Sequence, residues 1–466
     1  MNIYIAPQLE PEVGAMLQAF YSRSHESMQA RIESEPDPEK LKASLKQYYL
    51  GYGHDSINQN AFVTIAIEGV SMIAAKAIQD NQLYNGQESS TRYIPFDKQP
   101  IIAPPTDDGE GNVASKFMEI HKRLTKLCLD VELQNIVPDG EVYSAAQMRG
   151  IKAKVFDYTR CFLPLGTTTQ LSWVTSLHAA RDNCIRLMAS VYEEVRSIGV
   201  SIWNKLHAQF PNSFEAISEI PDYKQNLWSI DMAQLVESVP AYTLVPKTPS
   251  SHRRIGTFGA DFQIPKFIFS DEVEYGWAEQ TLEHLKSRPE RVAVPRRVDM
   301  IGRMAGTIPI DYGCWRELQR HRSAHITSPV LAPNCMHPWY TKSIYDIANR
   351  GDDPTRTEIL NLYTEGCELL YSIGGEKSPN YHYHLPLGCQ VYCEIDCGLA
   401  SAIYIAELRS RPSVHPILRG IAQAMGQAIQ RHYDIPVYVN DEEQADRSNQ
   451  TFIKSENNHE TPGVQG

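Results

Sequence analysis

The chain of 466 residues carries the same four-residue motif twice, and this repetition limits the folds open to it. Leu-Pro-Leu-Gly stands at positions 163–166 and again, 222 positions later, at 385–388. Each copy is followed by an apolar, helix-like stretch that reaches an arginine, Arg186 after the first copy and Arg409 after the second. Repetition at a fixed spacing indicates a duplicated structural unit. Half of the chain is long enough for one domain, so we expect two related domains.

The residue pattern predicts an α+β protein. Strands are expected at 3–6 and 61–68, and helices at 39–49, 71–78, 114–135, 170–208, 312–319, 390–408 and 416–433. A loop or the start of a strand is expected at 88–93, a loop at 99–113, and a boundary between the halves within 240–257. Residues from 441 on are polar, which favours disorder. We therefore expect two repeats, 1–240 and 241–440, each a mixed sheet flanked by helices, and a disordered tail at 441–466.

The charge of the chain argues against some partners. A net charge of −12 and a pI near 5.7 disfavour nucleic-acid binding, which favours a basic surface. Arginines that converge locally still allow an acidic protein to bind an anionic nucleotide. No apolar run reaches the roughly 18 residues that span a bilayer, and the N-terminus lacks the pattern of a signal peptide. An odd number of cysteines, nine, also suits a reducing compartment, so we expect a cytoplasmic protein with no membrane partner.

Five arginines are candidates for binding a phosphate group, because arginine combines a permanent charge with a fork of donors. They are Arg92, Arg160, Arg186, Arg320 and Arg409. Taken singly, each is more commonly a surface or ion-paired residue. Motif context favours Arg92, within Glu-Ser-Ser-Thr-Arg-Tyr at 88–93, and Arg320, within Arg-His-Arg at 320–322.

Two further residues of these motifs carry hydrogen-bonding chemistry. Ser90 lacks the elbow motif and the adjacent base of a nucleophile, so we interpret it as a substrate hydrogen-bond donor, with an ordinary loop serine as the alternative. His321 stands between Arg320 and Arg322, and like-charge repulsion predicts a lowered pKa. A neutral imidazole there can hydrogen-bond the ring of a ligand. The alternative is a helix-end histidine that binds a backbone carbonyl.

The cysteines do not predict a metal site. Cys389, Cys393 and Cys397 recur every fourth residue, which places them on one face of the helix expected at 390–408. This spacing does not match an iron–sulfur motif. His382 and His384 lack further ligands at a recognised zinc spacing. We interpret the thiols as buried packing groups and expect no metal.

The two halves keep complementary parts of one signature. Where the second half has Arg-His-Arg at 320–322, the first reads Asp-Asn-Gln at 80–82, and the residues after Arg322 lack the Ser-x-Arg-Tyr that the first half keeps. Joined together, the two pieces resemble the signature of the flavin-dependent thymidylate synthases. Gly-His-Asp-Ser at 53–56 and Tyr-Thr-Arg-Cys-Phe-Leu-Pro-Leu at 158–165 resemble further motifs of that family. The chain thus resembles two diverged copies of such a domain that form a pseudodimer.

The resemblance implies one composite site drawn from both halves, because each half has lost residues that the other keeps. A further instance of this loss is His382, which stands in the second half where the first has Arg160. The implied substrate-binding residues are Glu88, Ser90, Arg92, Arg160, Arg320 and Arg409. The implied catalytic residues are Ser90, Arg320 and Arg409. The implied cofactor-binding residues are His54, Ser56, Arg320, His321 and Arg322.

The resemblance also implies the chemistry, which is reductive methylation of deoxyuridylate (dUMP) to thymidylate (dTMP). It implies FAD as the cofactor, methylenetetrahydrofolate and NADPH as co-substrates, and a homodimer of pseudodimers. The chain departs from the family at Glu317, where a glutamine is expected, and at Ser176, His178, Gly398 and Ala400, near which flavin-contacting asparagines are expected.

Other functions stay open beside thymidylate synthesis. One is a non-catalytic nucleotide-binding or regulatory paralogue, which the missing asparagines favour. Another is flavin-dependent C5 modification of a different pyrimidine nucleotide. An unrelated α+β protein with coincident arginines is disfavoured by the repeated Leu-Pro-Leu-Gly motif.

Overall fold

The described residues form two compact units. A computed structural model describes residues 9–22, 27–34, 37–47, 55–105, 113–136, 144–217, 265–271, 276–290, 292–327, 329, 331, 335–373 and 379–441. The first unit comprises residues 1–89 and 168–236, and the second comprises residues 90–167 and 237–466. These units do not follow the two expected repeats, because residues 90–167 of the first half belong to the second unit. The repeat boundaries stay a prediction.

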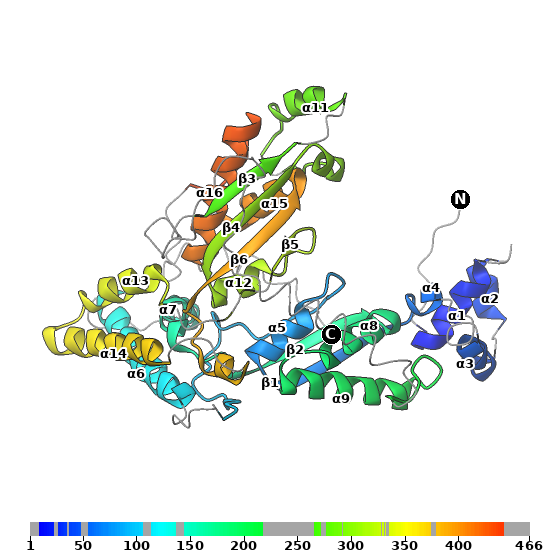
Figure 1. Ribbon diagram of the computed structural model, residues 1–466, viewed down its shortest axis with the longest axis horizontal. Helices are drawn as coiled ribbons and strands as arrows, with labels where there is room; N and C mark the ends of the chain where they lie inside the picture. The colour runs from blue at the N-terminus through cyan, green and yellow to red at the C-terminus, as the bar shows by residue number, and fades with distance from the viewer. Residues whose placement is uncertain are drawn as a thin grey trace, which may run out of the picture. The chain divides into compact units, whose positions relative to one another are not determined.

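The first unit is a pair of antiparallel strands with helices (Figure 1). Strand β1 (Phe62–Ser71) pairs with β2 (Thr168–Ser176). The pairing slips by one residue between Glu68 and Val70, where Gly69 adopts a φ of 67°, a left-handed conformation that favours glycine. The helices of this unit are α1 (Pro11–Tyr21), α2 (Met28–Glu33), α3 (Pro38–Lys46), α4 (Asp55–Asn58), α5 (Met72–Gln79), α8 (Leu177–Met188) and α9 (Glu193–Gln209).

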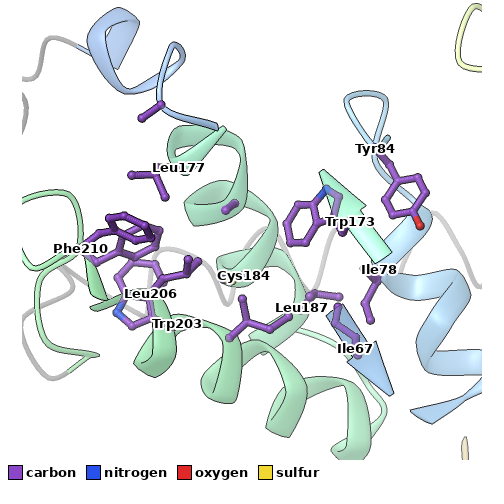
Figure 2. Close-up of a cluster of buried hydrophobic side chains, with 14 of the residues drawn as sticks. Ile67, Ile78, Tyr84, Trp173, Leu177, Cys184, Leu187, Trp203, Leu206 and Phe210 are labelled. Atoms are coloured by element: carbon purple, nitrogen blue, oxygen red, sulfur yellow. The ribbon is translucent and has the colours of Figure 1, made fainter. Parts of the chain in front are cut away.

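The core of the first unit joins its strands to its helices (Figure 2). Ile67 of β1 and Trp173 of β2 belong to one buried cluster with Leu187 of α8 and Trp203 of α9. The indole N–H of Trp203 donates to the carbonyl oxygen of Glu215 at 3.0 Å, so this large side chain is buried without leaving its polar atom unpaired. Each apolar side chain of this size contributes about 1.5–3 kcal/mol by leaving water.

The second unit is built on a four-stranded antiparallel sheet in the order β3-β4-β6-β5. The strands are β3 (Lys266–Ser270), β4 (Arg303–Asp311), β5 (His325–Ile326) and β6 (Gln390–Gly398). Helices α15 (Leu399–Arg409) and α16 (Pro416–Tyr433) pack against β4 (Figure 1). The other helices are α6 (Val113–Ile136), α7 (Ala145–Thr159), α11 (Ala278–Leu285), α12 (Tyr312–Leu318), α13 (Pro338–Ala348) and α14 (Asp353–Ser372), with the 3-10 helices η2 (Arg160–Phe162), η5 (Arg296–Met300) and η6 (Pro379–His384).

One order of elements occurs twice along the chain. The first occurrence is β1, α5, α6, α7, η2, β2, α8 and α9, and the second is β4, α12, α13, α14, η6, β6, α15 and α16, with β5 added. In both, the residue that ends the first strand caps the helix that follows. Ser71 accepts a hydrogen bond from the Ala74 N–H, and Asp311 accepts one from the Cys314 N–H. This recurrence supports the duplication.

Within the second unit the two Leu-Pro-Leu-Gly motifs pair with each other. The N–H of Leu165 donates to the carbonyl oxygen of Leu385 at 2.8 Å, and reciprocally the N–H of Leu387 donates to that of Leu163 at 2.9 Å. A second reciprocal pair of bonds extends the contact, from Gly166 to Tyr383 at 2.8 Å and from Gly388 to Cys161 at 2.9 Å. Reciprocal contacts of this kind are the mark of a two-fold relation between two equivalent surfaces.

Several sequence predictions are confirmed and others are wrong. The α+β class is confirmed, as are the strand at 61–68 and the helices at 71–78, 114–135, 312–319 and 416–433. The expected mixed sheet is wrong, because the described strand pairs are antiparallel. The strand expected at 3–6, the boundary at 240–257 and the tail beyond 441 lie outside the described residues. No helix in the described part of the chain is long and apolar enough to cross a membrane.

The helices predicted at 170–208 and 390–408 begin too early. Their first residues form β2 and β6, which pair with β1 and β4. Cys389, Cys393 and Cys397 therefore do not share a helical face as expected. A spacing of four residues repeats one face of a strand as well as one face of a helix, so the spacing alone could not distinguish them. All three thiols are buried, as the packing interpretation expects.

Replacing Gly166 with alanine should weaken the contact between the motifs. A Cβ at Gly166 would lie 2.1 Å from the carbonyl oxygen of Ile102 and 2.9 Å from that of Tyr383, so backbone has to shift. We expect Gly166→Ala to lower the free energy of unfolding by about 1–3 kcal/mol, as overpacking does. Chemical unfolding followed by circular dichroism measures this change.

Gly420→Ala is the matched control for this substitution. Gly420 lies within α16, and a Cβ there would meet no atom within 4 Å. We expect unchanged or slightly higher stability, by up to about 1 kcal/mol, because alanine favours a helix more than glycine does. Equal stability of the Gly166→Ala variant and the wild type would contradict the packing described for the motif.

Candidate functional site

Arg160, from the first half of the chain, is a buried arginine held by groups from the second half. It begins η2, directly after α7, and its side chain is 2% exposed. Its Nε donates to the hydroxyl of Tyr340 at 3.4 Å, and its Nη2 lies 3.3 Å from the sulfur of Cys314 and 3.7 Å from Asp311. The Tyr340 hydroxyl in turn donates to Asp311 at 2.9 Å. The positive charge of Arg160 is therefore compensated where it is buried.

Arg92 is anchored by α7. The preceding turn starts at Ser90, whose hydroxyl oxygen accepts a hydrogen bond from the Arg92 N–H at 3.3 Å. The Nε and Nη2 of Arg92 donate to the two oxygens of Asp157 at 2.7 and 2.9 Å, and Nη2 also donates to the carbonyl oxygen of Ser413 at 3.2 Å. Burial opposes the charge of Arg92, but the carboxylates of Asp157 and Glu317 outweigh it and raise the pKa of Arg92.

Arg409 joins the end of α15 to the end of α12. Its Nη2 donates to the backbone carbonyl of Glu317 at 2.8 Å, and its Nε donates to Nε2 of His321 at 2.7 Å. In the first unit, Arg186 of α8 donates in the same manner to the carbonyl oxygen of Ala77, in α5. The two arginines that follow the Leu-Pro-Leu-Gly motifs thus make equivalent contacts.

His321 is a neutral, buried imidazole. Burial first, and then the positive charges of Arg409 and Arg320, lower the pKa of His321 to about 3. Since Nε2 accepts a hydrogen bond from Arg409, the proton of the neutral ring lies on Nδ1, which is a donor. The predicted lowering is confirmed, but its cause differs from the expectation, because burial and Arg409 contribute more than the neighbours in sequence do.

Glu317 lies between the arginines of the two halves. One carboxylate oxygen is 3.8 Å from Nη1 of Arg92, and the other is 3.6 Å from Nη1 of Arg160. The Glu317 side chain is 23% exposed, whereas those of Arg92 and Arg160 are almost fully buried. This carboxylate is the point at which the predicted residues of the first half meet those of the second.

Exposed aromatic and charged groups lie around His321. They form the rim of the cluster in which Glu317 and the buried arginines meet. The ring of Tyr404, on α15, lies edge-on to the ring of His321 with 6.1 Å between the centroids, and Tyr404 is 57% exposed. Arg320 and Arg322, which flank His321 in sequence, are exposed. A planar ligand with anionic groups could contact both kinds of side chain.

The second unit thus contains seven of the predicted site residues. They are Ser90, Arg92, Arg160, Arg320, His321, Arg322 and Arg409. Glu88 belongs to the first unit, where it forms a buried ion pair with Lys76 at 2.7 Å and accepts a hydrogen bond from Gln79 at 2.9 Å. Ser56 is exposed in α4 of the first unit, and His54 lies outside the described residues. The functional roles of all these residues stay predictions.

Several residues that build the cluster were not found from the sequence. Asp157, Asp311 and Tyr340 orient the buried arginines, and only Asp157 stands near one of them in sequence, one helical turn before Arg160. Cys314 and His415 lie 3.2 Å apart and resemble a nucleophile and its base. Burial, however, raises the pKa of the Cys314 thiol and lowers that of His415, so the pair lacks the thiolate that such chemistry requires.

Comparison with known proteins identifies the family that the motifs resemble. Residues 7–212 match the family described as thymidylate synthase complementing protein. A flavin-dependent thymidylate synthase of Mycobacterium sp. (strain KMS) is 24% identical over 215 residues, which cover 44% of this chain and 81% of that protein. The resemblance to this family is therefore confirmed.

Other relatives match both halves of the chain. A UPF0159 protein of Chlamydia muridarum is 25% identical over 424 residues, covering 81% of this chain and 76% of that protein. A UPF0159 protein of Thermoplasma acidophilum is 21% identical over 453 residues, covering 84% of this chain and 87% of that protein. The alignments with these relatives extend over most of this chain, whereas the alignment with the Mycobacterium protein covers less than half of it.

The lowered pKa of His321 should appear in the pH dependence of stability. The unfolded histidine takes up a proton near its ordinary pKa of 6.5, and the folded one only near pH 3. Between these values the unfolded state binds more protons, so stability is lost as the pH falls. We expect His321→Gln, whose amide can still accept from Arg409, to lose less stability than the wild type between about pH 7 and pH 4.

Urea unfolding of both proteins across this pH range measures the difference. The wild type contains other titrating groups, so only the difference between the two curves reports on His321. Parallel curves would mean that the folded imidazole titrates normally and would contradict the burial described for it.

Proposed function

We propose that this protein makes dTMP from dUMP by flavin-dependent reductive methylation, with methylenetetrahydrofolate and NADPH as co-substrates. The observation that carries the proposal is the meeting of Arg92 and Arg160, from the first half, with the side chains of His321 and Arg409, from the second, around Glu317. The family match and the similarity to flavin-dependent thymidylate synthases support the same reaction.

The arginines suit the phosphate group of a nucleotide. Phosphate has several acceptor oxygens and up to two negative charges, and arginine offers planar pairs of donors that match it. The arginines are already oriented by Asp157, Asp311 and Tyr340, so little side-chain freedom is lost when an anion binds. Ser90, at the start of the turn that leads to Arg92, is our candidate for a further hydrogen bond to the substrate.

The rim residues suit a flavin. Tyr404 offers an exposed ring for a planar heterocycle, and neutral His321 offers its Nδ1–H to an acceptor on such a ring. Arg320 and Arg322 are exposed cations that can bind the phosphates of the dinucleotide. When bound, the flavin supplies the redox chemistry of the reaction, and these residues hold and orient it.

A second function is favoured by a specific feature of the chain. Gly398 precedes α15 and Ala400 is its second residue, so neither supplies the amide that the family places in this helix. A protein that binds nucleotides and no flavin would fit this feature. The absorbance spectrum of the purified protein separates the two functions. Oxidised-flavin bands that shift on addition of dUMP support the synthase, and failure to take up added FAD supports the nucleotide-binding alternative.

Substitution of Arg320 tests the proposed site. We expect Arg320→Gln to lower kcat/KM for dTMP formation by about 10- to 100-fold, because a hydrogen bond to a charged group contributes about 1.5–3 kcal/mol. The melting temperature should not change, since Arg320 is exposed. Arg356→Gln, an exposed arginine on α14, is the matched control and should keep wild-type activity. Unchanged activity of the Arg320 variant would exclude a role for this residue in the reaction.

We also propose that two copies of the chain associate, so that four related domains assemble as in the tetramers that the family resemblance implies. Light scattering coupled to size exclusion should then give a mass near twice 52.7 kDa. A mass that stays at the value of one chain over a wide concentration range would exclude this assembly.

A further inference from the structure

Glu317 faces one donor group of each buried arginine that, among the described residues, makes no other contact. In Arg92, Nε and Nη2 are bound to Asp157 and Ser413. In Arg160, Nε and Nη2 are directed at Tyr340, Cys314 and Asp311. In both residues Nη1 is the remaining nitrogen, and in both it points toward the Glu317 carboxylate.

The carboxylates of Asp157 and Glu317 differ in their distances from the arginines. Asp157 binds Arg92 through two hydrogen bonds of 2.7 and 2.9 Å, and its side chain is 6% exposed. Glu317 stands 3.6–3.8 Å from its two partners, which is too long for a hydrogen bond, and its side chain is 23% exposed. The contact of Glu317 with the arginines is therefore looser than that of Asp157, and its side chain has access to solvent.

The backbone of Glu317 is fixed independently of its side chain. Its carbonyl oxygen accepts the 2.8 Å hydrogen bond from Arg409, and the residue lies within α12, one position before the end of that helix. The carboxylate can thus leave the space between the guanidinium groups by rotation of the side chain while the helix and Arg409 stay in place.

We propose that Glu317 is an internal competitor for the space between Nη1 of Arg92 and Nη1 of Arg160, the seat in which the anionic group of the ligand binds. This inference rests on the proposed function, in which the anion is the phosphate monoester of a nucleotide. Displacement of one carboxylate by a phosphate brings more charge and more acceptor oxygens to the two donors. Glu317 thereby sets a threshold that favours dianionic phosphate over weaker anions such as carboxylates.

Removing the charge of Glu317 should tighten anion binding. We expect Glu317→Gln to bind inorganic phosphate and dUMP at least about tenfold more tightly than the wild type, because a neutral amide competes for the two guanidinium groups more weakly than a carboxylate does. Binding of deoxyuridine, which lacks the phosphate, should not change. Isothermal titration calorimetry of the full chain with each of the three probes measures these affinities. Glu365→Gln, an exposed glutamate on α14, is the matched control and should bind all three as the wild type does.

The inference and the proposed function fail in different ways. If no dTMP is formed and yet Glu317→Gln binds inorganic phosphate more tightly than the wild type, the proposed reaction is wrong and the anion seat stands. If Glu317→Gln melts at the wild-type temperature but binds phosphate equally or more weakly, the seat is wrong whatever the reaction. The wild-type protein soaked with phosphate provides a crystallographic test that needs no variant. Phosphate between the two Nη1 atoms, with Glu317 turned away, is expected, and phosphate elsewhere with Glu317 in place would overturn the inference.

Discussion

The pairing of the two Leu-Pro-Leu-Gly motifs is the constraint on which the second unit depends. Its four backbone hydrogen bonds join residues from opposite halves of the chain, and they reach Cys161, the residue directly after Arg160. The backbone next to the buried Arg160 is therefore held in place by these bonds. Residues that arrive from the other half, such as Asp311 and Tyr340, can then compensate the charge of Arg160.

The buried arginines of the candidate site need negatively charged partners, and these partners determine which donors stay near solvent. Buried guanidinium groups are tolerated only with partners, because removal from water costs several kcal/mol for each unpaired ion. Asp157 and Asp311 meet this requirement permanently and hold the arginines in place. Glu317 meets it in a contact that solvent can reach. The same residues that keep the fold stable in the absence of ligand thus leave two oriented donors near a surface, and the neutral imidazole of His321 lies beside them.

The sequence was sufficient to predict several helices and the equivalence of two arginines. Helices α6, α12 and α16 followed from periodicity, and the repeated motifs indicated the equivalence of Arg186 and Arg409. Periodicity failed at β2 and β6, where apolar residues at every second and every fourth position fit a strand and a helix alike. The partners of the arginines could not be predicted either. Tyr340 lies 180 residues from Arg160 in sequence, and only the folded chain brings the two together.

The reciprocal pairing also changes how the unit depends on concentration. Between separate molecules, two copies of a short backbone contact would associate in a second-order step and separate on dilution. Here both copies of the motif lie on one chain, so their association is a first-order step whose effective concentration is set by the connecting residues. The arrangement of Arg160 and its partners from the other half therefore persists at any dilution at which the chain stays folded. Each half is also free to lose the functional residues that the other half retains.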